Sequence, residues 1–97
     1  NNTITVRMPY QASTMPKPER KAVILAYFQD NEVMLPSGVT HRQLVEFRGI
    51  TFSENTTKRM LAELVDDGLM QQIDRGGHPL YTITADGEAW LADFEQS

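Results

Sequence analysis

The segment from Ser53 to Gly68 carries the polar side chains of this sequence that are best placed to recognise another molecule. Ser53 is a favoured N-cap residue and Gly68 a favoured helix stop, so we expect a helix over Glu54–Asp67. At 100° per residue, one side of this helix is apolar and packs inward, while the opposite side is exposed. The inward side comprises Thr57, Met60, Leu61, Leu64 and Val65, and the exposed side comprises Asn55, Arg59, Ala62 and Asp66, flanked by Thr56 and Lys58.

The exposed side of this expected helix carries groups that match the base edges of a DNA major groove. Asn55 can pair bidentately with adenine, and Arg59 can pair bidentately with guanine. Thr56 offers a methyl and a hydroxyl group, and Lys58 suits a phosphate. A polar outer side is also normal on a solvent-facing helix that binds nothing. Glu54 repels phosphate, but it can complement the helix dipole or accept a hydrogen bond from a cytosine amino group.

A second short helix is expected just before this one, over His41–Arg48. Thr40 fits its N-cap position, and Gln43 three residues later completes a capping box. His41 is expected to be a solvated residue of the first turn. Together with the neighbouring Arg42, it is a candidate for contacts to phosphate groups. Two short helices joined by a tight connection are the pattern of a helix-turn-helix.

The sequence after these helices predicts a β-hairpin. Residues 69–74 and 80–83 are short strand-like runs, and the connection over residues 75–79 contains two adjacent glycines that permit positive φ angles. Arg75 and His78 lie in this connection. Because a protruding hairpin can reach the DNA backbone or minor groove beside a bound helix, both residues are candidates for DNA contact.

The N-terminal part of the chain divides into an arm and a first helix. Residues 3–8 alternate apolar and polar positions, whereas prolines interrupt the stretch that follows. Residues 1–16 are therefore expected to form an arm that is either a strand or flexible. Pro18 suits the first turn of a mostly buried helix that extends to about Asn31. The domain itself is expected over residues 17–97.

A last helix is expected over residues 85–95, with Thr84 as its N-cap. Its apolar stripe includes Trp90 and Phe94. Large aromatic side chains at helical spacing more often pack in the core. The alternative is that they form the seam of a homodimer.

Composition indicates one globular domain, but the net charge is an objection to nucleic-acid binding. The 97 residues are 40% hydrophobic, with no cysteine and a formal net charge of −4. The lack of cysteine fits a reducing, cytoplasmic compartment, and no apolar run is long enough to span a membrane. Residues 1–62 hold eight Lys/Arg and five Asp/Glu (+3), whereas residues 63–97 hold one and eight (−7). A chain polarised in this way can turn its positive side to DNA. An ordinary acidic protein without such polarity is the alternative.

No pattern typical of an enzyme or a cofactor site occurs in the sequence. His41 and His78 lack metal-ligand spacing, and there is no cysteine, so no metal site is expected. The serines lack a nucleophile-elbow context, and the glycine pair of the hairpin lacks the strand–helix setting of a phosphate loop. We therefore expect neither catalysis nor a cofactor, and we infer no small-molecule ligand.

Two stretches of the chain resemble prokaryotic winged-helix regulators of the MarR/PadR type. Residues 56–69 read TTKRMLAELVDDGL, which matches the recognition-helix pattern T-x-x-R-x-L-x-x-L-x-x-x-G-L of those families. Residues 81–91 are similar to their wing strand and following helix, which read Y-x-I-T-x-x-G. The likeness covers about residues 18–94, and the sequence is especially similar to small archaeal repressor-like proteins of the haloarchaeal phage-repressor type. In this chain the connection between the two central helices is slightly longer than usual, and the wing carries a single arginine.

The resemblance implies an α+β winged helix-turn-helix, with a three-helix core, a two-stranded β-hairpin wing and a C-terminal helix. It implies that Arg59 is the recognition-helix arginine, that Asn55, Thr56 and Lys58 face the groove, and that Arg75 enters the minor groove. The expected function is sequence-specific binding of double-stranded DNA by a transcriptional regulator, a repressor that acts as a homodimer.

Two other functions remain open from the sequence. The net charge of −4 and Glu54 favour a winged-helix module that binds another protein, which a weak salt dependence of binding would indicate. The absence of an initial methionine and the unusual arm favour a DNA-binding part of a larger replication or recombination protein. A parent open reading frame much longer than this chain would indicate that function.

Overall fold

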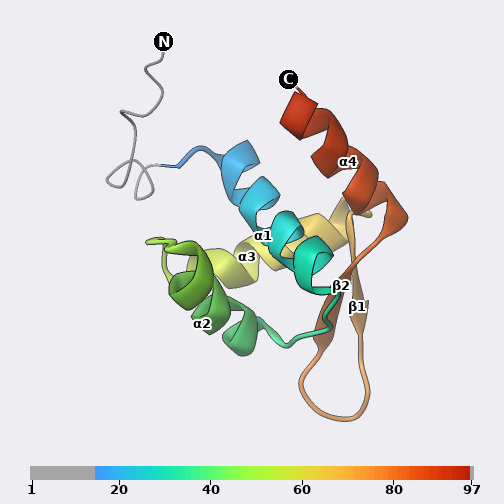
Figure 1. The fold of residues 1–97 in the computed structure, drawn as a ribbon. Coiled ribbons are helices and arrows are strands. Elements are labelled where there is room, and N and C mark those ends of the chain that lie inside the picture. Colours follow the sequence, from blue (N-terminus) through green and yellow to red (C-terminus); the bar gives the residue numbers. More distant parts are fainter. Residues whose placement is uncertain (1–14, 97) are drawn as a thin grey trace.

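The computed structural model describes residues 15–96, which form four helices and a two-stranded hairpin (Figure 1). This order confirms the expected fold class, and the predicted arm of residues 1–16 lies almost wholly outside the described residues. Within residues 15–96, none of the helices has the length and apolar character needed to cross a membrane. The elements are α1 (Lys17–Asn31), α2 (Ser37–Arg48), α3 (Glu54–Asp66), β1 (Met70–Ile73), β2 (Leu80–Ile83) and α4 (Ala85–Gln96).

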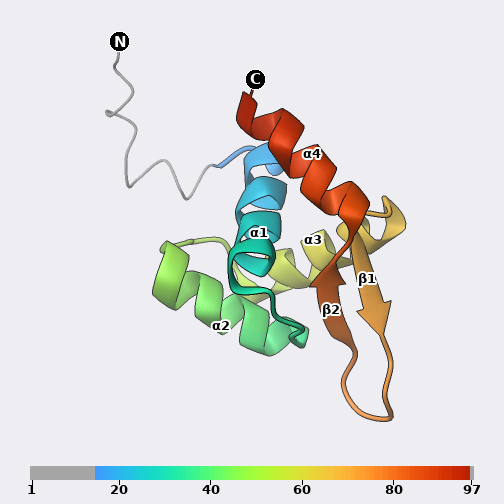
Figure 2. The ribbon, with the colours of Figure 1, turned by 45° about the vertical axis from the view of Figure 1, so that its right-hand side comes forward.

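The first three helices pack around one apolar core. α1 stands between α4 on one side and the crossing pair of α2 and α3 on the other (Figure 2). Each leucine or isoleucine that leaves water completely stabilises the fold by roughly 1.5–3 kcal/mol. The completely buried apolar side chains of the three helices are Ile24, Leu25 and Phe28 of α1, Leu44 of α2, and Leu61 and Leu64 of α3.

α3 begins as the sequence predicts and ends one residue earlier. The hydroxyl oxygen of Ser53 accepts a hydrogen bond from the backbone N–H of Thr56 at 3.2 Å, which is an N-cap contact. Gly68, with φ of 79°, adopts the left-handed conformation that commonly ends a helix. The residues predicted to face inward are buried, apart from the partly exposed Val65.

α2 begins earlier than predicted, at Ser37 rather than at His41. Its N-cap residue is Pro36, which has an extended backbone and no side-chain cap. Thr40 lies inside the helix, where its buried hydroxyl donates to the carbonyl oxygen of Pro36 at 2.9 Å. Gln43 accepts a hydrogen bond from a tyrosine of α1 instead of completing a capping box. The predicted cap was wrong because a threonine within a helix can satisfy its hydroxyl on the preceding turn.

The hairpin is joined to the helical core at its base. β1 and β2 pair antiparallel, with Met70 opposite Ile83. Leu35, in the connection between α1 and α2, forms a β-bridge with Tyr81 of β2, with N···O distances of 3.1 and 2.8 Å. This bridge fixes the base of the hairpin, while the tip projects beyond the helices (Figure 1). No pattern in the sequence predicted the bridge.

α4 lies along α1 and is capped as predicted (Figure 2). The hydroxyl oxygen of Thr84 accepts a hydrogen bond from the N–H of Gly87 at 3.0 Å. The same hydroxyl donates to the carbonyl oxygen of Gly68 at 2.8 Å, which ties the start of α4 to the end of α3. Trp90 and Phe94 are only partly buried and stack on each other with ring centroids 5.4 Å apart. The aromatic pair is therefore only partly in the core.

Candidate nucleic-acid interface

The outer side of α3 is open, as the sequence predicted. Asn55, Lys58 and Arg59 are exposed, and Thr56 is partly buried. The guanidinium of Arg59 donates a hydrogen bond to the hydroxyl of Thr56 at 3.3 Å, so the arginine lies back along the first turn of the helix. Ala62, also exposed, presents a small side chain one turn further on. A helix with this outer side can approach another surface closely and offer it both donors and acceptors.

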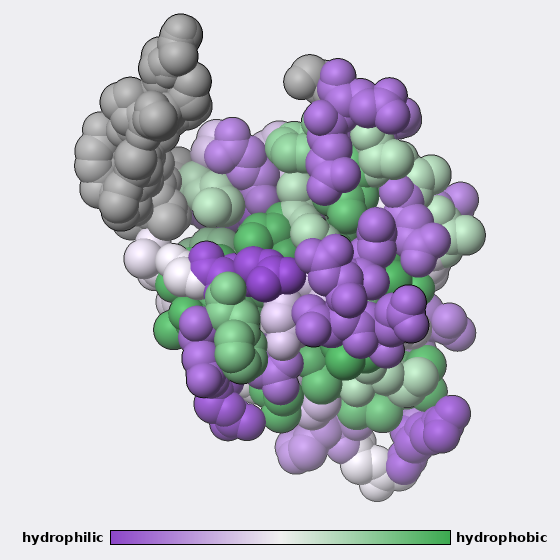
Figure 3. Space-filling model, viewed as in Figure 1, coloured by the Kyte–Doolittle hydropathy of each residue, from purple (hydrophilic) through white to green (hydrophobic). Residues whose placement is uncertain are grey.

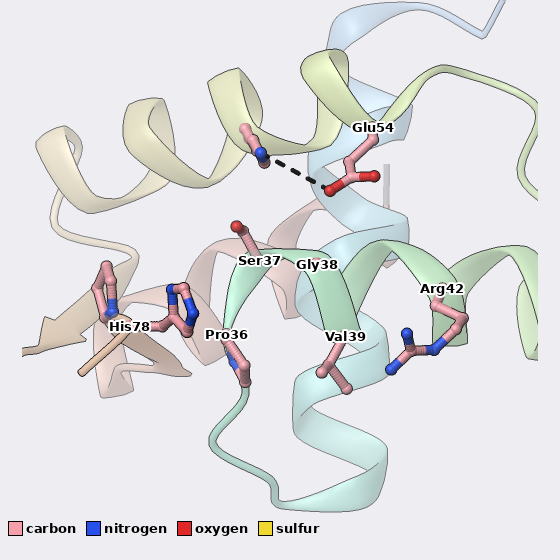
Figure 4. Close-up of a pocket in the computed structure, with 9 residues that line it drawn as sticks. Pro36, Ser37, Gly38, Val39, Arg42, Glu54 and His78 are labelled. Carbon is pink, nitrogen blue, oxygen red and sulfur yellow. Dashed lines mark ion pairs between the residues drawn. The ribbon is translucent and has the colours of Figure 1, made fainter.

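A hollow of about 340 Å³ lies between the start of α2, the start of α3 and the end of the hairpin loop (Figure 4). It brings together Arg42, Lys58 and His78, three predicted site residues from three separate elements. Arg75 is not among the residues that line it. The remaining lining residues are Pro36, Ser37, Gly38, Val39, Glu54 and Pro79.

The first turn of α2 is a part of this hollow that the sequence reasoning missed. The predicted helix of residues 41–48 excludes Ser37, Gly38 and Val39, because Thr40 fits its N-cap position. The available signal was Pro36, since a proline favours a helix boundary and an extended backbone before the first turn. Because the helix begins at Ser37, its free N–H groups and the positive end of its dipole face the same region as the basic side chains.

Most basic side chains of the described residues already have partners. Arg20 places its guanidinium over the ring of Phe52, 5.7 Å from the centroid. The ion pairs within residues 15–96 are Lys17–Glu63, Lys21–Asp67, Arg48–Asp30 and Lys58–Glu54.

Three exposed arginines form no ion pair with any residue in the described part of the chain, whereas Arg20, which also lacks one, is partly buried against Phe52. The three are Arg42, Arg59 and Arg75. All three are exposed, and all three are predicted site residues. An unpaired guanidinium on the surface retains its full capacity for bidentate hydrogen bonds to a phosphate or a guanine. The positive charge available to a partner therefore lies on α2, α3 and the hairpin loop.

His41 differs from its predicted environment. It is partly buried, and it is not in the first turn because α2 begins at Ser37. Its Nδ1 lies 2.8 Å from the hydroxyl oxygen of Thr57, which is completely buried in α3. The prediction of a solvated histidine was thus wrong, because the crossing of α2 and α3 brings the two side chains together. The contact fixes α2 relative to α3, and a phosphate contact by His41 stays a prediction.

The hairpin tip is exposed and polar. Arg75, Gly76, Gly77 and His78 are all exposed, and the tip appears hydrophilic at the lower right of the surface view (Figure 3). Gly76 has φ of 78°, a conformation that a side chain would strain. The loop therefore presents Arg75 on a turn that depends on glycine. No group of three or more potential metal-ligating side chains lies close enough together within residues 15–96 to hold a metal ion.

α4 is the most acidic helix of the described residues. α4 carries four acidic residues and no lysine or arginine. It packs on α1 at the end opposite the hairpin tip (Figure 1). The other four acidic residues of 63–97 are Glu63 and Asp66 of α3, Asp67 directly after it and Asp74 beside Arg75, so the charge polarity expected from the sequence is only partly a separation in space. The acidic residues of α4 are Asp86, Glu88, Asp93 and Glu95.

Comparisons with known proteins identify the fold. No protein-family model matches the sequence, and no curated protein matches it significantly. F93 from STIV, a winged-helix DNA-binding protein, has a TM-score of 0.71 at 14% identity, over 79% of this chain and 84% of F93. RosR of H. salinarum has a TM-score of 0.64 at 21% identity, over 78% of this chain and 68% of RosR. Bacillus subtilis PadR, solved in complex with operator DNA, has a TM-score of 0.64 at 21% identity, over 77% of this chain and 45% of PadR. At these identities the similarity shows a winged-helix fold, which confirms the fold implied by the sequence resemblance.

Proposed function

We propose that the chain binds double-stranded DNA and represses transcription by occluding a promoter. α3 enters the major groove, and the hairpin tip contacts the flanking backbone or minor groove. The observation that carries this proposal is that Arg42, Arg59 and Arg75 are exposed and form no ion pair with described residues. Arg59 lies on α3, Arg75 lies on the hairpin loop, and Arg42 of α2 lines the hollow between them. Two of the similar structures, F93 and PadR, are described respectively as DNA-binding and as bound to operator DNA, which supports the same function.

The residues divide into base-reading and phosphate-binding groups. Asn55, Thr56 and Arg59 are exposed or partly exposed in the first turns of α3, where a recognition helix meets base edges. The hollow beside them provides the phosphate-binding group, because a helix N-terminus and several basic side chains converge there. The phosphate-binding residues are His41, Arg42 and Lys58 near the hollow, with Arg75 and His78 on the hairpin loop.

We also propose that two copies bind a pseudo-palindromic site. A single α3 and one hairpin read only a few base pairs, whereas a symmetric pair doubles the length of sequence read. The partly exposed Trp90–Phe94 pair on α4 offers an aromatic surface for such a pairing. Sedimentation of the free protein and of its DNA complex measures the number of copies.

The experiment that tests DNA binding is a salt titration. The purified chain is mixed with labelled random-sequence duplex DNA, and with duplexes selected by the protein from genomic fragments. Phosphate binding releases counterions, so affinity for both duplexes should fall steeply between about 50 and 200 mM salt. Binding that is absent at low salt, or is insensitive to salt, would contradict the proposal.

A second candidate function, binding to another protein, is favoured by apolar side chains exposed on α2. Val45 is 46% exposed and Phe47 is 57% exposed, and the surface view shows apolar residues over this helix (Figure 3). Large apolar side chains exposed on a surface can belong to a protein interface. Binding through this surface would be weakened by Phe47→Ser and would change little with salt, which distinguishes it from DNA binding.

A further inference from the structure

Among the side chains that line the hollow, Glu54 alone carries a negative charge. It is the first residue of α3, and its carboxylate points across the hollow toward the first turn of α2 (Figure 4). A Cβ atom placed on Gly38 would lie 3.6 Å from Oε2 of Glu54, so the carboxylate lies against that turn. The same oxygen lies 3.7 Å from Nζ of Lys58.

These neighbours are the groups that a DNA phosphate would use. The N-terminus of α2 carries a partial positive charge, and Lys58 carries a full one. A carboxylate beside them neutralises part of this charge. A phosphate that enters the hollow must separate Lys58 from Glu54 and also overcome repulsion between two anions. DNA that is held only by phosphate contacts therefore binds more weakly than it would without the carboxylate of Glu54.

Glu54 is also placed where a recognition helix meets bases. As the first residue of α3, it can turn its exposed side chain from the hollow to the groove. There its carboxylate can accept a hydrogen bond from a cytosine amino group. Once it does so, Lys58 is free to bind a phosphate. A sequence without a cytosine at that position leaves the carboxylate in the hollow.

We propose that Glu54 is a specificity-determining residue, which opposes phosphate-only binding and accepts a hydrogen bond from cytosine in the preferred site. Specificity is the ratio of affinities for the preferred and for random sequences, so a residue that weakens only random binding raises it. This inference rests on the proposed function, DNA binding by α3, and adds one residue and one base type to it.

The test compares Glu54→Gln with Glu63→Gln. Both variants lose one negative charge from α3 and one ion pair, because Glu63 pairs with Lys17 at 3.0 Å outside the hollow. Each variant is titrated with random duplex and with the selected duplex, after thermal unfolding has shown that it folds. Glu54→Gln should bind random duplex about three- to tenfold tighter, with a salt slope steeper by about 0.9, as for one additional phosphate. Glu63→Gln should stay within about twofold of the unchanged protein.

Two further measurements show how Glu54 acts. In a Lys58→Gln background, Glu54→Gln should tighten binding to random duplex less than it does alone, because the part of the gain that comes from a freed lysine is absent and only the relief of anion repulsion remains. The base preference of Glu54→Gln, measured by selection, should lose a cytosine that the unchanged protein prefers. Retention of every base preference would overturn the proposal.

The remaining outcomes separate this inference from the proposed function. Equal gains in affinity for random duplex in Glu54→Gln and Glu63→Gln would show a general effect of net charge. Weaker binding of Glu54→Gln to random duplex would show that Glu54 favours DNA binding instead of opposing it. Either result would overturn the inference and leave salt-dependent DNA binding intact. If the unchanged protein and both variants bound no duplex at low salt, the proposed function and this inference would fail together.

Discussion

α3 and α4 are built alike, but α3 exposes cations beside its acidic residues and α4 exposes acidic residues alone. They contain 13 and 12 residues, each begins after a hydroxyl N-cap, and each buries one apolar side. The outer side of α3 presents Asn55, Lys58 and Arg59, whereas the outer side of α4 presents acidic residues and no cation. Amphipathic spacing alone therefore explains why both helices pack, but it does not distinguish a binding helix from a structural one.

The difference lies in the basic side chains that only α3 of the two helices carries, and in how those side chains are paired. DNA has one negative charge for about every 1.7 Å of its length, so α4 would be repelled along its whole exposed side. α3 keeps Arg59 unpaired beside the hollow that contains Arg42 and Lys58. In this account, α4 stabilises the domain and α3 binds DNA. The following predictions separate these two roles.

Leu91→Ala should have the largest effect, and that effect should be on stability. Leu91 of α4 is 2% exposed and packs in the core. Its truncation should lower the free energy of unfolding by about 2–5 kcal/mol, through lost burial and the cavity left behind. Urea unfolding measures the change. At a temperature where the variant is folded, its DNA affinity should match that of the unchanged protein, and a selective loss of DNA affinity would contradict a structural role for α4.

Arg59→Ala should have the next largest effect, on sequence recognition. Loss of a bidentate contact to guanine should cost about 1–3 kcal/mol of specific binding. Fluorescence anisotropy on the selected duplex measures it. The stability should change little, because Arg59 is exposed and its described contact is one hydrogen bond to Thr56. Unchanged affinity for the selected duplex would remove Arg59 from the base-reading group.

Arg75→Ala should have a smaller and more uniform effect. A phosphate contact at the hairpin tip should weaken binding to selected and random duplexes alike and reduce the salt slope by about 0.9. The same salt titration, run on both duplexes, measures this. A loss confined to the selected duplex would instead show that Arg75 reads bases, and an unchanged slope would place the hairpin tip outside the interface.

Glu88→Gln should have the smallest effect. Glu88 is exposed in the first turn of α4, and nothing in the account places it near DNA. The free energy of unfolding of this variant should differ from that of the unchanged protein by no more than about 0.5 kcal/mol, as is usual for surface substitutions. Its DNA affinity should stay within the error of the anisotropy titration. A clear gain in affinity would mean that DNA approaches α4, and the contrast between the two helices would then fail.

The predictions from sequence succeeded where a local signal determines the structure. The N-cap at Ser53, the stop at Gly68 and the cap at Thr84 depend on residues within a few positions, and each is present in the structure. The start of α2 was missed because Thr40 has two ways to satisfy its hydroxyl, and only tertiary packing decides between them. The spacing of polar residues likewise predicted the open side of α3 but could not show what lies beside it.

The candidate site could not be predicted from the sequence alone, because its residues come from separate elements. His78 of the hairpin loop reaches the hollow formed by α2 and α3 through the base of the hairpin, which the unpredicted Leu35–Tyr81 bridge fixes. The pairing of His41 with Thr57 depends on the crossing of two helices. Ion pairing of the lysines in α1 depends on Glu63 of α3 and on Asp67 directly after it. The spacing of residues along the sequence does not reveal any of these contacts.

Nuclear magnetic resonance of the ¹⁵N-labelled protein, titrated with the selected duplex, tests the central claim most directly. Amide shifts should change in the first turns of α3, the first turn of α2 and the hairpin tip, and should remain unchanged at Asp86 and Glu88 of α4, which lie outside the aromatic pair proposed for pairing of two copies. Changes confined to α4 or to the exposed apolar residues of α2, with none in α3, would contradict the account.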